Sequence, residues 1–270
     1  MLSPSPRLIL CDSHVHFYDC FELDNFLDSA WNNFYQQAKL QQKQHEFIAV
    51  LLLTEAKEDR WFLNLKENKY QSDRWSFLHT DEAESLYAVD KDDCRILIIN
   101  GRQIVTSENM EVLALITDGK LEDGKPMTRV IDWVKDNNAI PVIPWGFGKW
   151  WGNRGRVLSK VLESYGSDEV LLGDNSGRPW FLGRPNHFKK AGSVQRRILP
   201  GSDPLPFASE SWRPGSVGFY FTASLDDSFP AKSMRESLKD AKTNITNYMR
   251  CERLLPFIRN QVAMQLRNRI

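Results

Sequence analysis

The longest apolar runs of the chain predict strands that are buried on both faces. Residues Arg7 to Asp12 and Phe47 to Leu53 are almost uninterrupted hydrophobic stretches, a pattern typical of strands in parallel sheets. Between them, the segment from Phe21 to His45 carries apolar side chains at roughly helical spacing. The chain is therefore expected to open with a strand, a helix and a second strand.

The middle of the chain carries shorter apolar runs separated by polar turns. Asn100-Gly101 lies between two of these runs, and this dipeptide is a hairpin signal. We therefore expect an antiparallel strand insertion around residues 75–117. Its strand candidates are Trp75 to His79, Ser85 to Val89, Arg95 to Ile99 and Val112 to Ile116.

Strand and helix candidates alternate through the rest of the chain, with strands at 140–144, 169–172, 197–200 and 217–222 and helices at 127–137, 157–165, 231–242 and 254–266. Such alternation favours an α/β protein. No Gly-x-Gly-x-x-Gly or Walker loop follows any strand, which argues against a nucleotide-binding sheet. The pattern predicts a single domain over residues 1–270, folded as a TIM-like (β/α) barrel, regular or distorted. In such barrels, functional residues gather at the carboxyl ends of the strands.

Composition narrows the class of partner. Lys plus Arg and Asp plus Glu number 35 each, so the formal net charge is zero and no global basic field favours nucleic acid. No apolar run approaches the roughly 20 residues that span a bilayer, and the first residues lack the pattern of a signal peptide. The four cysteines show no paired spacing. We expect a cytoplasmic protein acting on a small molecule, without a nucleic-acid or membrane partner; the oligomeric state stays open.

Two histidines at the end of the first apolar run are the clearest chemical signal. Residues i and i+2 of a strand point to the same face, so His14 and His16 are expected to project side by side while Val15 faces away. Imidazole is a good ligand for zinc, manganese or iron, and a strand fixes the spacing of the two rings. The alternative is that both rings simply make hydrogen bonds within a core.

Other polar side chains follow the later strand candidates. Glu55, Asp174 and Asp203 are candidate carboxylates for holding a metal or moving a proton, and Lys149 is a candidate catalytic cation. Either aspartate could instead cap its glycine-flanked turn, and Glu55 could instead be an exposed carboxylate at a helix start. A second group of residues lies in candidate mouth loops and could bind an anionic substrate: Arg102, Trp145 and Arg178.

These motifs resemble metal-dependent hydrolase barrels, namely the polymerase and histidinol phosphatase (PHP) family and the wider amidohydrolase superfamily. The resemblance rests on His-x-His after the first strand and on Gly201-Ser202-Asp203 after a late one. It implies a barrel with divalent metals and hydrolysis of phosphoesters, amides or lactones, with His14, His16 and Asp203 as ligands. The sequence departs from the family pattern, because Gln103 stands where a glutamate is expected and Trp145 and Pro204 stand where histidines are.

Two functions follow from these observations. The first is hydrolysis of a small substrate (a phosphoester, amide or lactone, with an anionic substrate as a candidate) at a reduced single-metal site, with Zn, Mn or Fe held by His14, His16 and Asp203 and helped by Glu55 or Asp174. In it, Asp203 or Asp174 acts as general base. The second is a barrel that has lost catalysis and holds no metal, serving as a ligand- or partner-binding protein; the missing histidines favour it.

Overall fold

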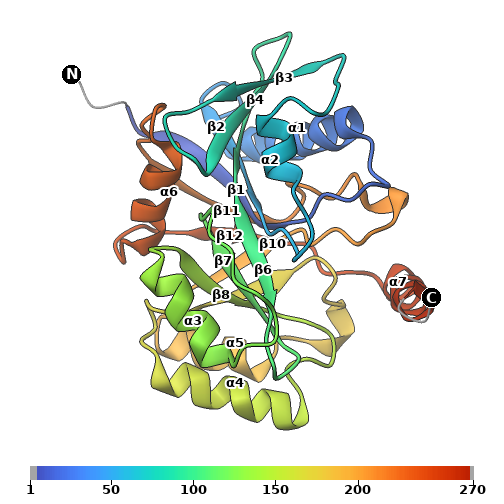
Figure 1. The fold of residues 1–270 in the computed structure, drawn as a ribbon, viewed down its shortest axis with the longest axis vertical. Helices are drawn as coiled ribbons and strands as arrows, with labels where there is room; N and C mark the ends of the chain where they lie inside the picture. The colour runs from blue at the N-terminus through green and yellow to red at the C-terminus, as the bar shows by residue number, and fades with distance from the viewer. Residues whose placement is uncertain (1–4, 268–270) are drawn as a thin grey trace.

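The computed structural model describes residues 5–267 and contains two mixed β-sheets rather than one closed barrel (Figure 1). The larger sheet has seven strands in the order β12-β11-β1-β2-β5-β4-β3. Its strands are β1 (Arg7–Val15), β2 (Phe47–Leu53), β3 (Trp75–His79), β4 (Ser85–Asp90), β5 (Arg95–Ile99), β11 (Gly218–Ala223) and β12 (Thr246–Tyr248).

The smaller sheet has five strands in the order β10-β9-β8-β7-β6. Strands β8, β9 and β10 run parallel to one another, whereas β6, β7 and β8 pair antiparallel. The bounds are β6 (Gly101–Val105), β7 (Glu111–Leu115), β8 (Ile140–Pro144), β9 (Leu171–Asn175) and β10 (Ile198–Gly201).

The predicted TIM-like barrel is therefore wrong, and the reason lies in the strands between residues 75 and 115. A (β/α) barrel requires parallel strands that each lead into a helix. Here β4 pairs antiparallel with both β3 and β5, and β6 pairs antiparallel with β7, with no helix between the consecutive strands. These antiparallel pairs produce two sheets of mixed direction.

Asn100-Gly101 does not form the predicted hairpin. It lies where the chain passes from β5 in the larger sheet to β6 in the smaller one. A Cβ atom on Gly101 would lie 2.6 Å from the Leu53 carbonyl oxygen and 2.8 Å from that of Ala114. Glycine is thus required here by the close approach of two backbones, and not by a turn.

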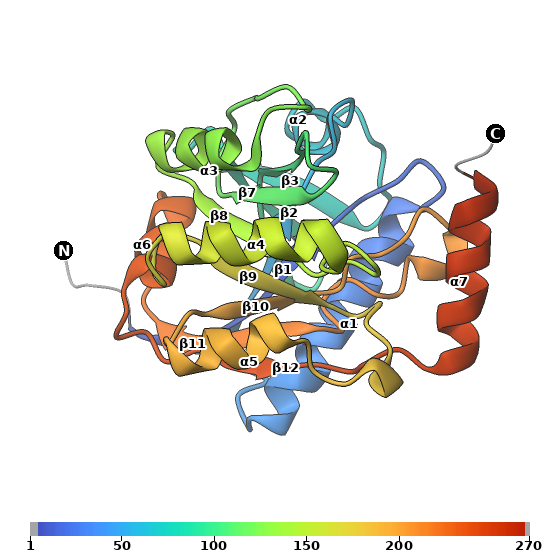
Figure 2. The same ribbon diagram turned by 90° about the horizontal axis from the view of Figure 1, so that it is seen from below.

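Helices cover the outer faces of the two sheets (Figures 1 and 2). Helix α1 packs on the larger sheet through Phe26 and Phe34, whereas α3, α4 and α5 pack on the smaller sheet. α6 closes one end of the molecule and α7 lies at the opposite end. The bounds are α1 (Leu23–Leu40), α2 (Trp61–Lys66), α3 (Met127–Asp136), α4 (Gly152–Ser164), α5 (Asn186–Ser193), α6 (Pro230–Lys239) and α7 (Leu254–Arg267), with short 3₁₀ turns at Trp180–Leu182 and Ala208–Glu210.

A third apolar cluster joins the inner faces of the two sheets. Successive β1 side chains alternate between clusters, since Leu8 and Leu10 face the α1 side while Ile9 and Cys11 meet residues of the smaller sheet such as Leu199. This alternation follows from the two-residue period of a strand. Strand β1 is therefore a central strand with an apolar cluster packed against each of its two faces. Within residues 5–267, no helix combines the length and apolar character needed to cross a membrane.

Candidate metal centre

The two histidines project from the end of β1 into one site. His14 and His16 are 3% and 4% exposed, and their Nε2 atoms lie 3.0 Å apart. The pairing of β1 with β2 is irregular between Asp12 and Val15, so the strand bends at the point where it presents the two rings. The sequence prediction that these side chains lie together agrees with this geometry.

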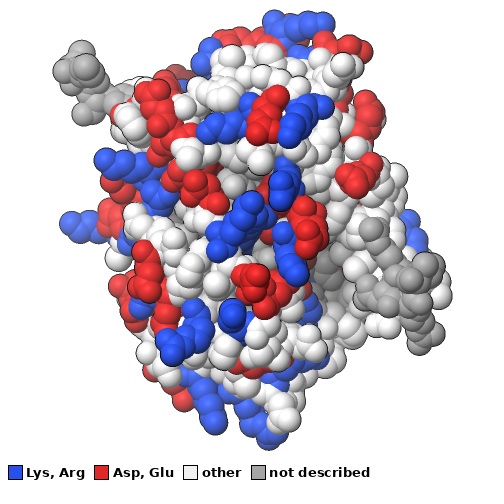
Figure 3. All heavy atoms as spheres, viewed as in Figure 1, with Lys and Arg blue, Asp and Glu red and all other residues white. Residues whose placement is uncertain are grey.

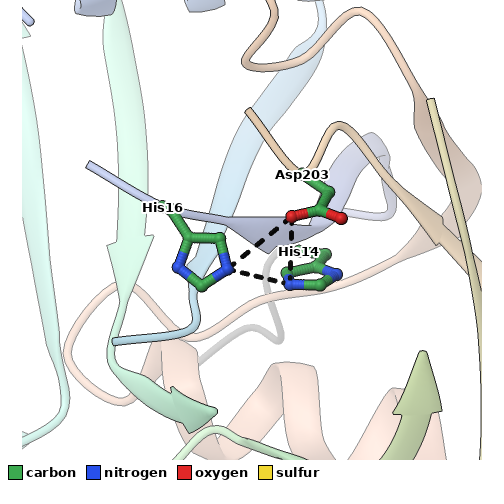
Figure 4. Close-up of side chains that lie close together, drawn as sticks. All are labelled: His14, His16 and Asp203. Atoms are coloured by element: carbon green, nitrogen blue, oxygen red, sulfur yellow. Dashed lines mark hydrogen bonds and ion pairs between the residues drawn. The ribbon is translucent and has the colours of Figure 1, made fainter. Parts of the chain in front are cut away.

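Asp203 joins the histidines from the loop after β10. Its backbone N–H donates a hydrogen bond to the His14 carbonyl oxygen over 2.8 Å, and its φ of 45° lies in the left-handed region. Its Oδ1 atom lies 3.6 Å from His14 Nε2 and 3.7 Å from His16 Nε2 (Figure 4). The neighbouring Gly201 permits this approach, because a Cβ there would lie 2.4 Å from the His14 nitrogen.

The three ligand atoms fit a single metal ion. A triangle with sides of 3.0, 3.6 and 3.7 Å has a circumscribed radius of about 2.0 Å, which matches the length of Zn–N and Zn–O bonds of about 2.0–2.2 Å. One point therefore lies at bonding distance from all three atoms. Among the described residues, this trio is the cluster of three or more side chains that could hold a metal.

Burial keeps both imidazoles in the form that binds metals. It lowers the pKa of His14 to about 4 and that of His16 to about 4, with the neighbouring His14 adding to the effect on His16. Both rings are then neutral at pH 7 and offer lone pairs. Burial raises the pKa of the Asp203 carboxyl, while His16 acts in the opposite direction.

Amide side chains contact two members of the trio. Gln103 Oε1 lies 3.2 Å from His14 Nε2, the same ring nitrogen that faces the other two residues. The Asn175 amide donates hydrogen bonds to Asp203 Oδ2 over 2.8 Å and to the Trp145 carbonyl oxygen over 2.9 Å. His16 differs, because its buried Nδ1 has no hydrogen-bond partner in the described part of the chain, and its ring stacks on Tyr18 instead.

Two members of the trio, His16 and Asp203, line a cavity of about 330 Å³. Lys149 and Glu111 also line it and form an ion pair with each other, and the buried side chain of Trp145 forms part of the wall. This volume suits a small molecule. A larger hollow of about 920 Å³ lies beside β11 and β12, but its described lining contains no histidine.

Glu55 and Arg102 are placed together away from the trio. Arg102 Nη1 donates to Glu55 Oε2 over 3.2 Å, and Glu55 Oε1 accepts from the Phe62 N–H in the first turn of α2. Both side chains are buried, and neither lines the cavity among its described walls. Their functional groups are thus engaged in joining β2, α2 and β6.

Asp174 and Arg178 form a second buried pair outside the cavity. The Arg178 Nε and Nη2 atoms donate to the two Asp174 oxygens over 2.8 and 2.9 Å. The next residue, Asn175, faces the cavity instead, because neighbouring side chains of a strand point to opposite faces. Sequence reasoning missed the part played by Asn175; the two-residue alternation at the end of β9 was the signal that could have found it.

Comparison with known proteins gives a relationship in fold. No family model matches the chain, and no curated protein matches it. The chain is similar to the crystal structure of PsfC from Pseudomonas syringae PB-5123, with a TM-score of 0.53, 13% sequence identity and coverage of 98% of each chain. At this identity the likeness concerns the fold alone.

Proposed function

We propose that this protein is a metal-dependent hydrolase of a small substrate, with one divalent ion held by His14, His16 and Asp203. The observation that carries the proposal is the single point about 2.0 Å from all three ligand atoms. Two imidazoles and one carboxylate form a donor set suited to Zn, Fe or Mn, with coordination positions left for water and substrate.

The neighbouring residues support this assignment. Asn175 holds one oxygen of Asp203, which leaves the other facing the histidines. Hydrogen-bond partners of this kind orient metal ligands and raise metal affinity. Gln103 Oε1 lies beside the ligating atom Nε2 of His14 and is therefore a candidate additional oxygen donor.

The chemistry of hydrolysis needs a group that takes a proton and a group that stabilises negative charge. A divalent ion would polarise the substrate carbonyl or phosphoryl oxygen and lower the pKa of water. In this scheme Glu111, which lines the same cavity, accepts a proton and becomes neutral. The ammonium group of Lys149, paired with Glu111 until then, is thereby released to stabilise the single negative charge of the transition state. Asp174 has no part in this scheme, because both of its oxygens bind Arg178.

The test is elemental analysis of protein purified without chelators. We expect close to one transition-metal ion per chain in the wild type, and little in the His14→Ala and His16→Ala variants. His79→Ala is the matched control, since this histidine is exposed on β3. The metal found also matters, because the same donor set holds Fe(II) in oxygenases. A wild-type protein with only trace metal would overturn the proposal and favour the second predicted function, a ligand-binding protein without catalysis.

A further inference from the structure

The cavity above the metal centre is enclosed on its outer side by α7. Residues Phe257, Asn260, Gln261, Met264 and Gln265 of this helix line the same cavity as His16 and Asp203. In both ribbon views α7 lies apart from the two sheets, at the end of the molecule opposite α6 (Figures 1 and 2). The far wall of the site is thus supplied by a separate helix.

The charges that line this cavity leave no cation for an anionic substrate. Two cations line it, and each is already paired: Lys149 with Glu111, and Arg213 with both Glu210 and Glu252. Arg259 also reaches Glu210, at 3.8 Å, but from a side chain that is 63% exposed and lies outside the described lining.

The balance of charge is therefore negative before a metal is added. Four carboxylates line the cavity, those of Glu111, Asp203, Glu210 and Glu252, against two cations. A divalent ion would bring the net charge of the lining side chains to zero. The two negative charges of a dianionic substrate would then have no unpaired positive charge to balance them. On the exterior, by contrast, both signs of charge are interspersed over the face drawn in Figure 3.

Part of the lining is apolar and aromatic, although α7 also contributes the polar side chains of Asn260, Gln261 and Gln265. Phe257 is 8% exposed and packs against Phe147, with ring centroids 5.1 Å apart, and against Phe181, at 5.8 Å. Phe147 and Phe257 line the cavity together with Leu205 and Met264. Apolar walls of this kind bind the hydrocarbon part of a ligand, while a few polar groups fix its orientation.

We infer that the site takes an uncharged substrate whose aryl or alkyl group lies against Phe257 and Phe147 while its hydrolysable bond lies at the metal centre. This inference rests on the proposed function and adds the substrate class. It sets aside phosphomonoesters and favours uncharged carbonyl compounds, such as esters and amides with an apolar substituent. Phe257 is then the residue that determines specificity, and it acts through packing rather than through chemistry.

Calorimetric titration of the zinc-loaded full-length protein tests the inference with three probes. Benzohydroxamic acid is uncharged in neutral solution, loses one proton when it chelates zinc, and carries a phenyl group. Acetohydroxamic acid has the same head group without the ring, and phenylphosphonic acid has the ring with a head group that carries up to two negative charges. We expect benzohydroxamic acid to bind about tenfold or more tightly than acetohydroxamic acid, because a buried ring contributes that much. Phenylphosphonic acid is expected to bind more weakly than benzohydroxamic acid, because its charge is not compensated.

Variants locate the effect. Phe257→Ala should weaken the binding of benzohydroxamic acid by about tenfold and change the Kd of acetohydroxamic acid by less than about twofold. Phe257→Leu should keep most of the difference in affinity between the two probes. Phe181→Ala is the matched control, since this aromatic ring contacts Phe257 but lies outside the described lining of the cavity.

The outcomes separate the two proposals. Zinc measured in the protein after dialysis reports on the metal centre independently of any probe. If zinc is bound but phenylphosphonic acid binds best, or Phe257→Ala weakens both hydroxamic acids equally, the substrate class is wrong while the metal centre stands. If no zinc is bound, both proposals fail.

Discussion

The carboxylate of Asp12 accepts a hydrogen bond of 2.8 Å from the backbone N–H of Ser202, a residue 190 positions later in the chain. The same carboxylate accepts from the N–H groups of His14 and Gly215. One fully buried side chain therefore joins the strand that carries the histidines to the loop that carries Asp203. The relative position of the two histidines and Asp203 therefore depends on this connection.

Replacing Asp12 by asparagine is expected to lower the free energy of unfolding by about 1–3 kcal/mol, because at least one buried N–H donor loses its acceptor. Urea denaturation monitored by circular dichroism measures the change. Asp92→Asn, at an exposed position, is the control and should alter stability by less than about 0.5 kcal/mol. Equal changes in the free energy of unfolding for the two variants would show that the hydrogen bonds of Asp12 do not stabilise the fold.

Protonation of the histidines is expected to destabilise the metal-free protein in acid. Their pKa of about 4 in the folded protein lies below the ordinary value of 6.5. The unfolded chain therefore binds more protons between these values, and the contribution of the histidines to stability, complete above pH 6.5, is lost as the pH falls toward 4. The measurement is urea unfolding in EDTA from pH 4 to 8.

The buried Asp12 acts in the opposite direction, since burial raises its pKa from 3.8 to about 7 and its contribution is lost as the pH rises toward 7. The informative quantity is thus the difference between the wild type and the His14→Asn/His16→Asn double variant. That difference should change with pH between 4 and 6.5 and stay level above. A difference that stays level throughout would contradict the lowered pKa values.

Removing the metal is expected to lower the melting temperature. Zinc at about one hundred times its Kd stabilises the folded state by about 2.7 kcal/mol, which for a domain of this size corresponds to roughly 5–10 °C. Differential scanning calorimetry with and without EDTA measures the shift. His16→Ala should show almost none, and an undiminished shift in that variant would mean that zinc binds elsewhere.

Arg102 is expected to act on stability rather than on substrate binding. Arg102→Met leaves the buried Glu55 carboxylate without its partner and should cost about 3–5 kcal/mol. The double variant Glu55→Gln/Arg102→Met should recover part of this loss. Arg95→Met, which breaks an exposed pair with Asp93, should cost less than about 1 kcal/mol. Denaturant titration of all four proteins measures these free energies of unfolding. A wild-type stability for Arg102→Met would refute the prediction that Arg102 stabilises the fold through Glu55.

The sequence predicted the core of the candidate site because its signals are local. That holds for His14 and His16, which the alternation at the end of β1 put on one face. Asp203 has no such local signal: it was predicted from its position after a strand and from the resemblance of Gly201-Ser202-Asp203 to a hydrolase motif. The parts played by Arg102 and Glu55 could not be predicted, since these residues lie 47 positions apart and meet only after β2 and β6 approach. The Asp174–Arg178 pair could not be predicted either, since a spacing of four brings side chains together on a helix, whereas Asp174 lies in β9 and Arg178 in the turn after it.

The fold was predicted less well, for a physical reason. Runs such as Arg95–Ile99 and Gly101–Val105 show that each segment is extended and buried, but not which neighbour it pairs with. Pairing direction depends on contacts distant in sequence. The passage between sheets at Gly101 has the same local sequence as a tight turn, so only the packing around it distinguishes the two.

The separation of α7 from the two sheets divides the site between two parts of the chain with different constraints. His14, His16 and Asp203 lie at the ends of buried strands, where almost any substitution disturbs the interior. The aromatic wall comes from a helix near the end of the chain, joined to the remainder by a short segment and a few side-chain contacts. Related proteins could therefore acquire new substrates by altering this helix alone, while the chemistry at the floor of the cavity stays as it is.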